Sequence, residues 1–487
     1  MIKRFIYSFH RILGTCLSIL FLMWFLTGFV MMYHSFPKLT EKDRYAHRQS
    51  LILPEHLSET DSLIGQKQAE NTPTSLILDS YFGKTRLRIN GEDSTHQLVL
   101  TSEGWKQQQP PSFSEIRKYA QHWDASSPIV RVDTLHDLEQ WIPFSKLRAD
   151  LPVYKFYFKD SHQLYVSSVT GEALQWTDRN SRFWSYMGAI PHWIYFSRLR
   201  QDAGLWKTVV ITLSGAGSLM CLAGILLGLR STGIIRKRKK KGLTPYKKTG
   251  YRWHHYSGLS FGLFVFSFVF SGMMSMTNVP TIFVNIHHPE RSDTLKRSSL
   301  HGLTFRTDYR LITGKYPNRV KELQFTSLGG LPVYRAIIND SLQVFDASTE
   351  KLTPLHLSRK DIYSITASDS SSARIDTLRS YDNYYGKIGK KLPLPVLKVS
   401  VKDADKSVYY INPYSGETNY YNRNDRVSHW CYQVLHRFAF GFLVEHNTIR
   451  LALLWVALLG GAFASLTGVY LSIRYLRRKA KKTARIG

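Results

Sequence analysis

The chain has 487 residues, a formal net charge of +29 and a slightly negative mean hydropathy. This length allows several domains, and the hydropathy excludes a chain that is apolar throughout. Three cysteines are too few for a disulfide-rich scaffold.

The apolar residues are concentrated in four runs with almost no charge. Each run has about twenty or more residues, the length that a membrane-spanning helix needs. The runs cover Ile12–Tyr33, Leu205–Leu229, Leu259–Phe283 and Leu451–Ile473. The first run is too long for a signal peptide, and a similar run recurs in mid-chain. We therefore expect a membrane protein with four spans.

Basic residues predict the orientation of these spans. Segments 1–11, 230–252 and 474–487 hold three, ten and seven Lys or Arg residues and no Asp or Glu. In a four-span chain all three segments lie on the same side, which the positive-inside rule assigns to the cytoplasm. The run Arg236–Lys241 is expected to contact anionic lipid and not nucleic acid.

These patterns divide the chain into nine segments with both termini in the cytoplasm. The cytoplasmic segments are 1–11, 230–252 and 474–487, the spans are 12–33, 205–229, 253–283 and 449–473, and the periplasmic segments are 34–204 and 284–448.

Residues in the two halves correspond at an offset of about 244. Phe9–Gly14 matches Trp253–Gly258, and each stretch opens an apolar run. His192 matches His436 in the same way. Further matches at this offset are Gly28 with Gly272, Phe196 with Phe440, Gly224 with Gly468, and Arg230 with Arg474. The pattern predicts an internal duplication in which each half keeps two histidines.

The two long outer segments carry strand signals. Residues 85–90 and 97–100 flank an Asn-Gly turn signal, and residues 151–158 and 163–166 form a second hairpin pattern. The other outer segment repeats this pattern at 331–346 and 394–417. Residues 113–123 have helical spacing. We expect two hairpin modules in each half.

Two motifs resemble a known family. Val408–Glu417 reads Val-Tyr-Tyr-Ile-Asn-Pro-Tyr-Ser-Gly-Glu, and Leu164–Glu172 is a weaker copy; both resemble the PepSY motif. The His-x-x-x-Gly helix openings resemble the PepSY-associated transmembrane family, which includes iron-regulated inner-membrane proteins and haem-containing ferric-siderophore reductases. The resemblance covers essentially the whole chain. It implies a four-helix transmembrane bundle with two periplasmic α+β lobes.

Four histidines are the candidate ligands. His10 and His254 lie at the cytoplasmic ends of the first and third spans, and His192 and His436 precede the second and fourth. Neutral imidazole is a good axial ligand for haem iron, and facing helices of a bundle commonly hold cofactor ligands. Family members that reduce siderophores bind two haems. The expected cofactor is haem b, with His10 and His254 on one haem iron and His192 and His436 on the other.

Other histidines remain alternatives. His255 lies beside His254 and competes with it for the inner site, although it aligns with Arg11. His34, and His287 with His288, lie near the outer ends of the first and third spans and could replace an outer ligand. His429 and His446 flank His436 and are weaker candidates.

The resemblance favours a membrane ferric-siderophore reductase, an electron-transfer protein that releases iron at the periplasmic face. No GxGxxG after a strand, P-loop, HExxH or Cys-x-x-Cys-His motif occurs, so the electron donor would be a quinol or a flavoprotein, and no residue is expected to act as an acid, base or nucleophile. The alternative is a non-enzymatic PepSY module that binds and regulates envelope proteases. The histidines would then have no ligand role.

Overall fold

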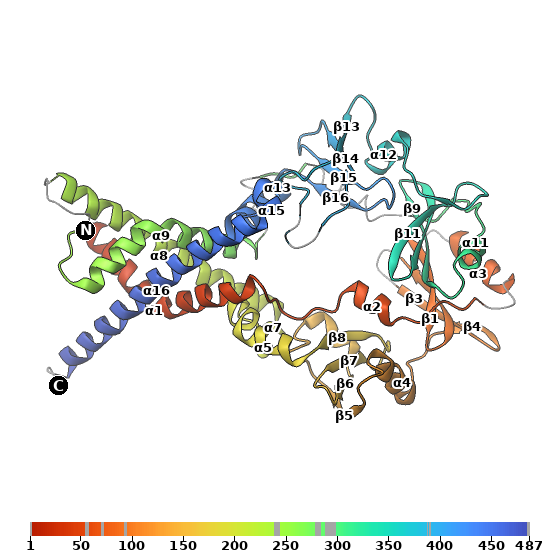
Figure 1. The fold of residues 1–487 in the computed structure, drawn as a ribbon, viewed down its shortest axis with the longest axis horizontal. Coiled ribbons are helices and arrows are strands. Elements are labelled where there is room, and N and C mark those ends of the chain that lie inside the picture. The colour runs from red at the N-terminus through yellow and green to blue at the C-terminus, as the bar shows by residue number, and fades with distance from the viewer. Residues whose placement is uncertain are drawn as a thin grey trace.

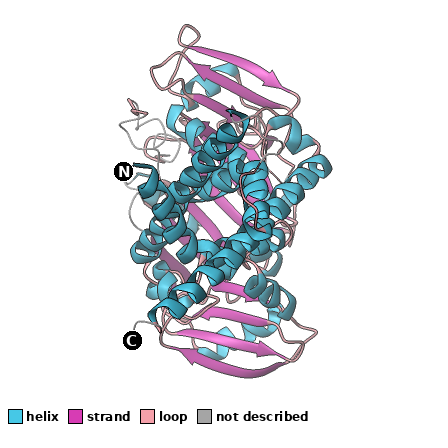
Figure 2. Cartoon of the chain, turned by 90° about the vertical axis from the view of Figure 1, so that its left-hand side faces the viewer, coloured by secondary structure: helices cyan, strands magenta, loops and turns pink. Residues whose placement is uncertain are grey.

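The computed structural model describes residues 2–53, 58–69, 73–91, 95–237, 244–277, 284–287, 299–386, 388 and 391–484. Four long helices lie together at one end of the molecule, and three β-sheets lie at the other (Figure 1). Both chain termini are at the helical end. Figure 2 views the molecule from that end, with the helices in front of the sheets.

Among the described residues, four helices are long and apolar enough to cross a membrane, as predicted. They are α1 (Ile2–Met31), α8 (Ala203–Lys237), α9 (Thr249–Met274) and α16 (Asn447–Thr483). α8 and α16 continue beyond the apolar runs into the basic segments, where Lys and Arg are good helix formers. α9 ends at Met274; the expected end of this span at 283 lies outside the described residues.

The four helices form a closed bundle. α1 packs on α8 and α16, and α9 packs on the same two helices. α1 and α9 are therefore diagonal partners that face each other across the bundle axis. The apolar core at mid-height is rich in aromatic rings, and Phe25 contacts Phe268 edge to face at 6.0 Å between ring centroids. Interior rings of this kind keep water out of the middle of the bundle.

The outer segments, as far as the structure describes them, form sixteen strands in three antiparallel sheets. The first sheet has the order β12-β11-β10-β9-β1-β2-β3-β4, and the other two have the orders β5-β6-β7-β8 and β13-β14-β15-β16. The strands of the first half are β1 Ser75–Tyr81, β2 Lys84–Asn90, β3 Thr95–Thr101, β4 Gly104–Gln107, β5 Ile129–Leu135, β6 Val153–Phe158, β7 Gln163–Ser167 and β8 Ala173–Thr177. Those of the second half are β9 Val320–Leu328, β10 Leu331–Ile338, β11 Ser341–Asp346, β12 Thr353–Pro354, β13 Ala373–Leu378, β14 Val396–Val401, β15 Val408–Ile411 and β16 Thr418–Tyr421.

Short helices connect these sheets to one another and to the bundle. They are α2 Glu41–His47, α3 Ser58–Ala69, α4 Phe113–Trp123, α5 Arg179–Met187, α6 Ala189–Trp193, α7 Ser197–Arg200, α11 Arg310–Lys315, α12 Arg359–Ile365, α13 Arg423–His429, α14 Leu435–Arg437 and α15 Gly441–Glu445, with 3₁₀ and π turns at Ser145–Asp150 and Trp430–Val434. The helix predicted at 113–123 is present as α4, and Ser112 caps it by a hydrogen bond with Glu115 N.

The outer regions of the two halves share one sheet. β1 of the first half pairs with β9 of the second, with Leu78 opposite Leu323. This pairing fuses one four-stranded part of each half into the eight-stranded sheet. The other two sheets flank it separately (Figure 1). Strand edges readily accept a further strand, and the alternating residues of β1 and β9 give a shared core on one face.

Candidate ligand pairs in the helix bundle

The ends of the bundle helices nearest the chain termini, here called the inner ends, bring His10 and His254 together (Figure 1). His10 lies on α1 and His254 on α9, the two diagonal helices, and their ring centroids are 6.2 Å apart with an interplanar angle of 38°. The two rings are therefore neighbours across the bundle axis, and they are tilted relative to each other and not stacked.

Hydrogen bonds orient both inner rings through the same atom. His10 Nδ1 lies 3.0 Å from the carbonyl oxygen of Met220, and His254 Nδ1 lies 2.9 Å from Thr467 Oγ1. The Thr467 hydroxyl itself donates to the carbonyl of Ala464 at 2.7 Å. A ring held through Nδ1 presents Nε2 for another partner, the arrangement typical of histidine ligands.

Glycines make room for the inner rings. A Cβ on Gly224 of α8 would lie 2.6 Å from His10 Cε1, and one on Gly468 of α16 would lie 3.7 Å from His254 Cε1. Any side chain at position 224 would therefore displace His10. Gly224 and Gly468 match at the offset between the halves, and each lies beside one histidine of the inner pair.

A cavity of about 490 Å³ adjoins the inner pair. Ligand sites of small molecules and cofactors usually have volumes of about 300–1,000 Å³. His10, His254 and His255 line the cavity together with many apolar and glycine residues, and Arg11 and Arg478 line it as well. His255 Nε2 lies 3.3 Å from Thr232 Oγ1.

The outer ends of the helices bring His192 and His436 together. These residues lie on the short helices α6 and α14, and their ring centroids are also 6.2 Å apart, with an interplanar angle of 65°. His192 Nδ1 lies 3.0 Å from Thr27 Oγ1, and His436 Nδ1 lies 3.0 Å from Ser271 Oγ. Thr27 and Ser271 are related by the same offset along the chain as the two histidines.

Loss of contact with bulk water lowers the pKa of His192 to about 4 and that of His436 to about 3. Both imidazoles are consequently neutral at pH 7, which is the form that binds a metal ion.

The backbone after each outer histidine is unusual. Ile194 and Phe438 have φ angles of 55° and 53°, in the left-handed region that side chains other than glycine rarely adopt. Each ends a short helix just after the histidine. Such a conformation costs about 1–3 kcal/mol and is found where the surroundings hold it in place.

Neighbouring side chains hold these two loops. Trp206 Nε1 donates to the carbonyl of Trp193 at 2.8 Å, and Arg450 Nη1 donates to that of Arg437 at 3.1 Å. Both donors lie in the first turn of the span that follows. The loop after His192 is also held by Gln140, which accepts from Ser197 N at 3.2 Å.

The second half has an equivalent of the Gln140 contact. Asn383 Oδ1 accepts from Gly441 N at 3.0 Å. The sequence patterns did not identify these supporting residues or Thr27 and Ser271. The signal that could have found them is the offset between the halves, applied to polar residues as well as to histidines.

The remaining histidine candidates lie in other surroundings. His34 stacks on Trp184 with ring centroids 4.5 Å apart and planes at 2°. His287 Nδ1 contacts Asp405 Oδ1 at 3.0 Å, and His429 packs beside Tyr384. His446 precedes α16. His288 lies outside the described residues.

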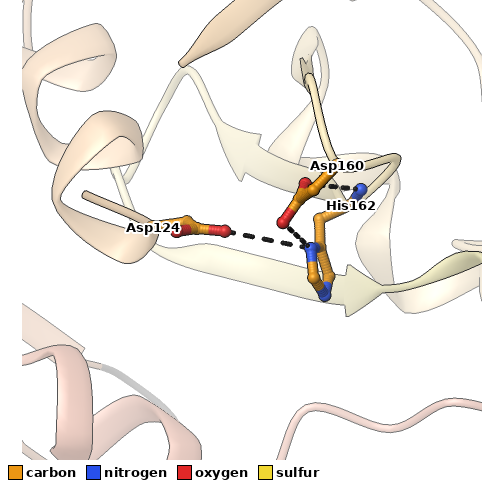
Figure 3. A group of neighbouring side chains, drawn as sticks. All are labelled: Asp124, Asp160 and His162. Atoms are coloured by element: carbon orange, nitrogen blue, oxygen red, sulfur yellow. Dashed lines mark hydrogen bonds and ion pairs between the residues drawn. The ribbon is translucent and has the colours of Figure 1, made fainter. Parts of the chain in front are cut away.

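A different group of possible metal ligands lies between the end of α4 and the β6–β7 turn (Figure 3). His162 Nδ1 is 2.6 Å from Asp160 Oδ2 and 3.8 Å from Asp124 Oδ2, so one nitrogen faces both carboxylates. Asp124 Oδ1 already accepts from the Ser126 hydroxyl at 2.6 Å. A proton on Nδ1 satisfies this arrangement, and we assign it to a hydrogen-bonded turn.

Comparison with models of known protein families and with curated protein sequences gives no match to this chain.

Proposed function

We propose that this chain is a haem-containing electron-transfer protein of the bacterial inner membrane that reduces ferric siderophores at the periplasmic face. The observation that carries the proposal is the presence of two facing histidine pairs, His10 with His254 and His192 with His436, each at 6.2 Å between ring centroids. All four rings are anchored by Nδ1.

The ring separation suits a metal ion held between two imidazoles. A ligating nitrogen lies about 2.0–2.1 Å from a metal ion, and the ring centre lies roughly 1.1 Å further on. Two opposed rings would then have centroids about 6.2–6.4 Å apart, which agrees with both pairs. A macrocycle between the rings would fit the 490 Å³ cavity at the inner pair. Arg11 and Arg478 would pair with its carboxylate groups.

The positions along the helices favour one site near each membrane face. His10 and Thr27 lie on α1, and His254 and Ser271 lie on α9 with the same separation along the chain. At about 1.5 Å per residue this separation places the two pairs about 25 Å apart along the helix axis, compared with a hydrocarbon core of about 30 Å.

Each residue has a defined role in this proposal. A bound haem would supply one-electron oxidation and reduction at iron. The four imidazoles hold the iron, and the Thr27 and Ser271 hydroxyls fix the orientation of the outer rings. The aromatic core between the pairs excludes water from the bundle.

Topology and ancestry belong to the same proposal. With the three basic segments in the cytoplasm, both termini lie inside and the three sheets lie in the periplasm. The common strand order of β5–β8 and β13–β16, together with the matched left-handed residues Ile194 and Phe438, supports an internal duplication with PepSY-like modules.

The proposed substrate is a ferric siderophore or a similar ferric chelate. Oxygen donors bind Fe³⁺ more tightly than Fe²⁺, so a one-electron reduction would release the iron. The electrons would come from a membrane quinol or a cytoplasmic flavoprotein. The mildly basic outer segments suit anionic chelates.

A reoxidation assay tests this function. Protein purified in detergent is reduced with dithionite, freed of excess reductant and mixed with a ferric siderophore, and the visible spectrum and captured Fe²⁺ are followed. We expect reoxidation with one Fe²⁺ per electron lost. Reduced protein that stays reduced in the presence of a panel of ferric chelates would contradict the proposed reaction.

A further inference from the structure

The outer part of the first half contains a second cavity, of about 510 Å³. It lies where the β1–β2 turn, α2, α4 and the β7–β8 turn meet, among the sheets and away from the long helices (Figure 1). Four Lys or Arg side chains line it, with two carboxylates and an aromatic wall. The basic residues are Arg44, Arg48, Arg86 and Lys118.

The cavity is not a necessary consequence of the fold, because the second half closes the same junction. Across the β1–β2 pair, Asp79 faces Arg86; at the same distance from the turn in β9–β10, Thr326 faces Val333. Val333 is fully buried in an apolar cluster that joins the two sheets. The first half thus has a buried ion pair where the second has apolar packing.

Two of the arginines serve to hold the cavity wall. Arg86 contacts Asp79 at 2.8 Å and Glu172 at 2.9 Å, and Arg48 pairs with Glu322. Their charges are compensated within the protein. A buried ion network is costly unless every charge is paired. Both arginines have carboxylate partners here, so the junction is polar where the second half has apolar packing.

One further donor in the cavity lacks a hydrogen-bond acceptor. Within the part of the chain that the structure describes, Arg44 Nε is buried and makes no hydrogen bond. Its ion pair with the exposed carboxylate of Glu41, at 3.6 Å, is longer than a hydrogen bond. Buried donors normally find a partner, and a negatively charged acceptor would suit a guanidinium best. Lys118 is exposed at the edge of the cavity.

Part of the cavity wall is aromatic. Phe82 packs edge to face on Tyr81 at 4.6 Å and on Tyr119 at 5.7 Å between ring centroids. A ring-shaped ligand can stack or pack edge-on against such a surface. We propose that this cavity is a binding site for a small organic anion that carries a carboxylate and a flat aromatic group, with the carboxylate at Arg44 and the ring against Phe82 and Tyr119.

Ligand-observed NMR with the full chain in lipid nanodiscs tests the site, with sodium benzoate and salicylate as probes. We expect saturable binding of both. Arg44→Gln should weaken it about tenfold or more, since a hydrogen bond to a charged group is lost, and Lys118→Gln less. The control Arg374→Gln alters an exposed arginine on β13 that does not line the cavity and should leave binding unchanged.

Three outcomes would overturn the proposal. One is the absence of saturable benzoate or salicylate binding at millimolar concentration. Another is equal binding of benzylamine, which has the ring and the opposite charge. The third is a loss of affinity in Arg374→Gln as large as that in Arg44→Gln. The site does not depend on haem, so a failure here leaves the proposed electron transfer untouched.

Discussion

His192 and His436 belong to opposite halves of the chain, and their imidazole centroids are 6.2 Å apart at the outer end of the bundle. The equivalent separation at the inner end, between His10 and His254, is the same. Both pairs join diagonal parts of the bundle, so each would depend on both halves of the chain. The following predictions rest on this geometry.

Because Gly224 lies close to His10, the addition of one methyl group at position 224 should disturb the inner histidine pair and leave the outer pair unchanged. Gly224→Ala would place Cβ 2.6 Å from His10 Cε1, and overpacking of this kind costs about 1–3 kcal/mol. We expect loss of about half of the bound haem, measured against protein by absorption.

The matched control is Gly233→Ala on the same helix, where a Cβ meets nothing within 4 Å. It should keep all haem and can gain up to about 1 kcal/mol of helix propensity. Equal haem content in both variants would show that the space beside His10 is not needed.

The hydroxyls behind the outer pair predict matched effects. Thr27→Val removes a partner of His192 Nδ1, and removal of such a partner typically weakens metal binding by about 10–100-fold. Ser271→Ala should have a similar effect, because each ring also has a backbone acceptor, the Trp24 carbonyl for His192 and the Phe268 carbonyl for His436.

A potentiometric titration checks this prediction. The midpoint of the outer haem should rise in both variants, since a less basic imidazole stabilises Fe³⁺ less, while that of the inner haem stays fixed. Thr208→Val, on the exposed surface of α8, is the control. A shift of both midpoints together would contradict the assignment of these hydroxyls to the outer pair.

The ion network at the sheet junction predicts a stability effect that depends on pH. Burial alone would raise the pKa of Asp79, but Arg86 and Arg88 outweigh it and hold the pKa below its ordinary value. Asp79 therefore stabilises the fold above its ordinary pKa of about 3.9, and this stabilisation is lost as the pH falls through the lowered value. Arg86→Met should cost less at pH 7 than the about 3–5 kcal/mol typical of a broken buried ion pair, because Arg88 at 2.9 Å and Arg48 at 3.4 Å still pair with Asp79.

A double variant that introduces the equivalent residues of the second half tests the contribution of the Asp79–Arg86 ion pair to stability. Asp79→Thr with Arg86→Val reproduces the Thr326–Val333 pair and should be more stable than Arg86→Met in thermal unfolding followed by circular dichroism. If the double variant is less stable than both Arg86→Met and the unaltered chain, the ion pair contributes more than its replacement by apolar packing.

The basic segments predict the membrane topology. A reporter domain fused after residue 484 should be active if it is a type that works in the cytoplasm and inactive if it is a type that works in the periplasm. A reporter inserted at the exposed Gln107 of β4 should show the reverse pattern. Replacing the Lys and Arg residues of 474–482 by Gln should weaken this preference. The opposite reporter pattern in the unaltered chain would invert the proposed direction of electron transfer.

The sequence predicted those features that depend on local pattern or on repetition. Apolar runs predicted the four long helices, and the offset predicted that His10 and His192 each have a counterpart. The pairing of β1 with β9 was missed because strands in opposite halves of the chain leave no local signal. The sequence did not predict that Arg86 is buried. The alternation in 85–90 places charged side chains on one face of the strand, and from sequence alone such a face is expected to be exposed to solvent.

The most direct test of haem ligation by these pairs is the haem content of the purified unaltered chain, His10→Ala and His436→Ala, with His96→Ala on the exposed part of β3 as a control. We predict about two haems in the unaltered chain and the control, with sharp reduced α and β bands, and about one in each of the two ligand variants. A colourless preparation from haem-replete cells, or a haem content that neither substitution changes, would contradict haem ligation by these pairs and would leave the regulatory binding module as the better account.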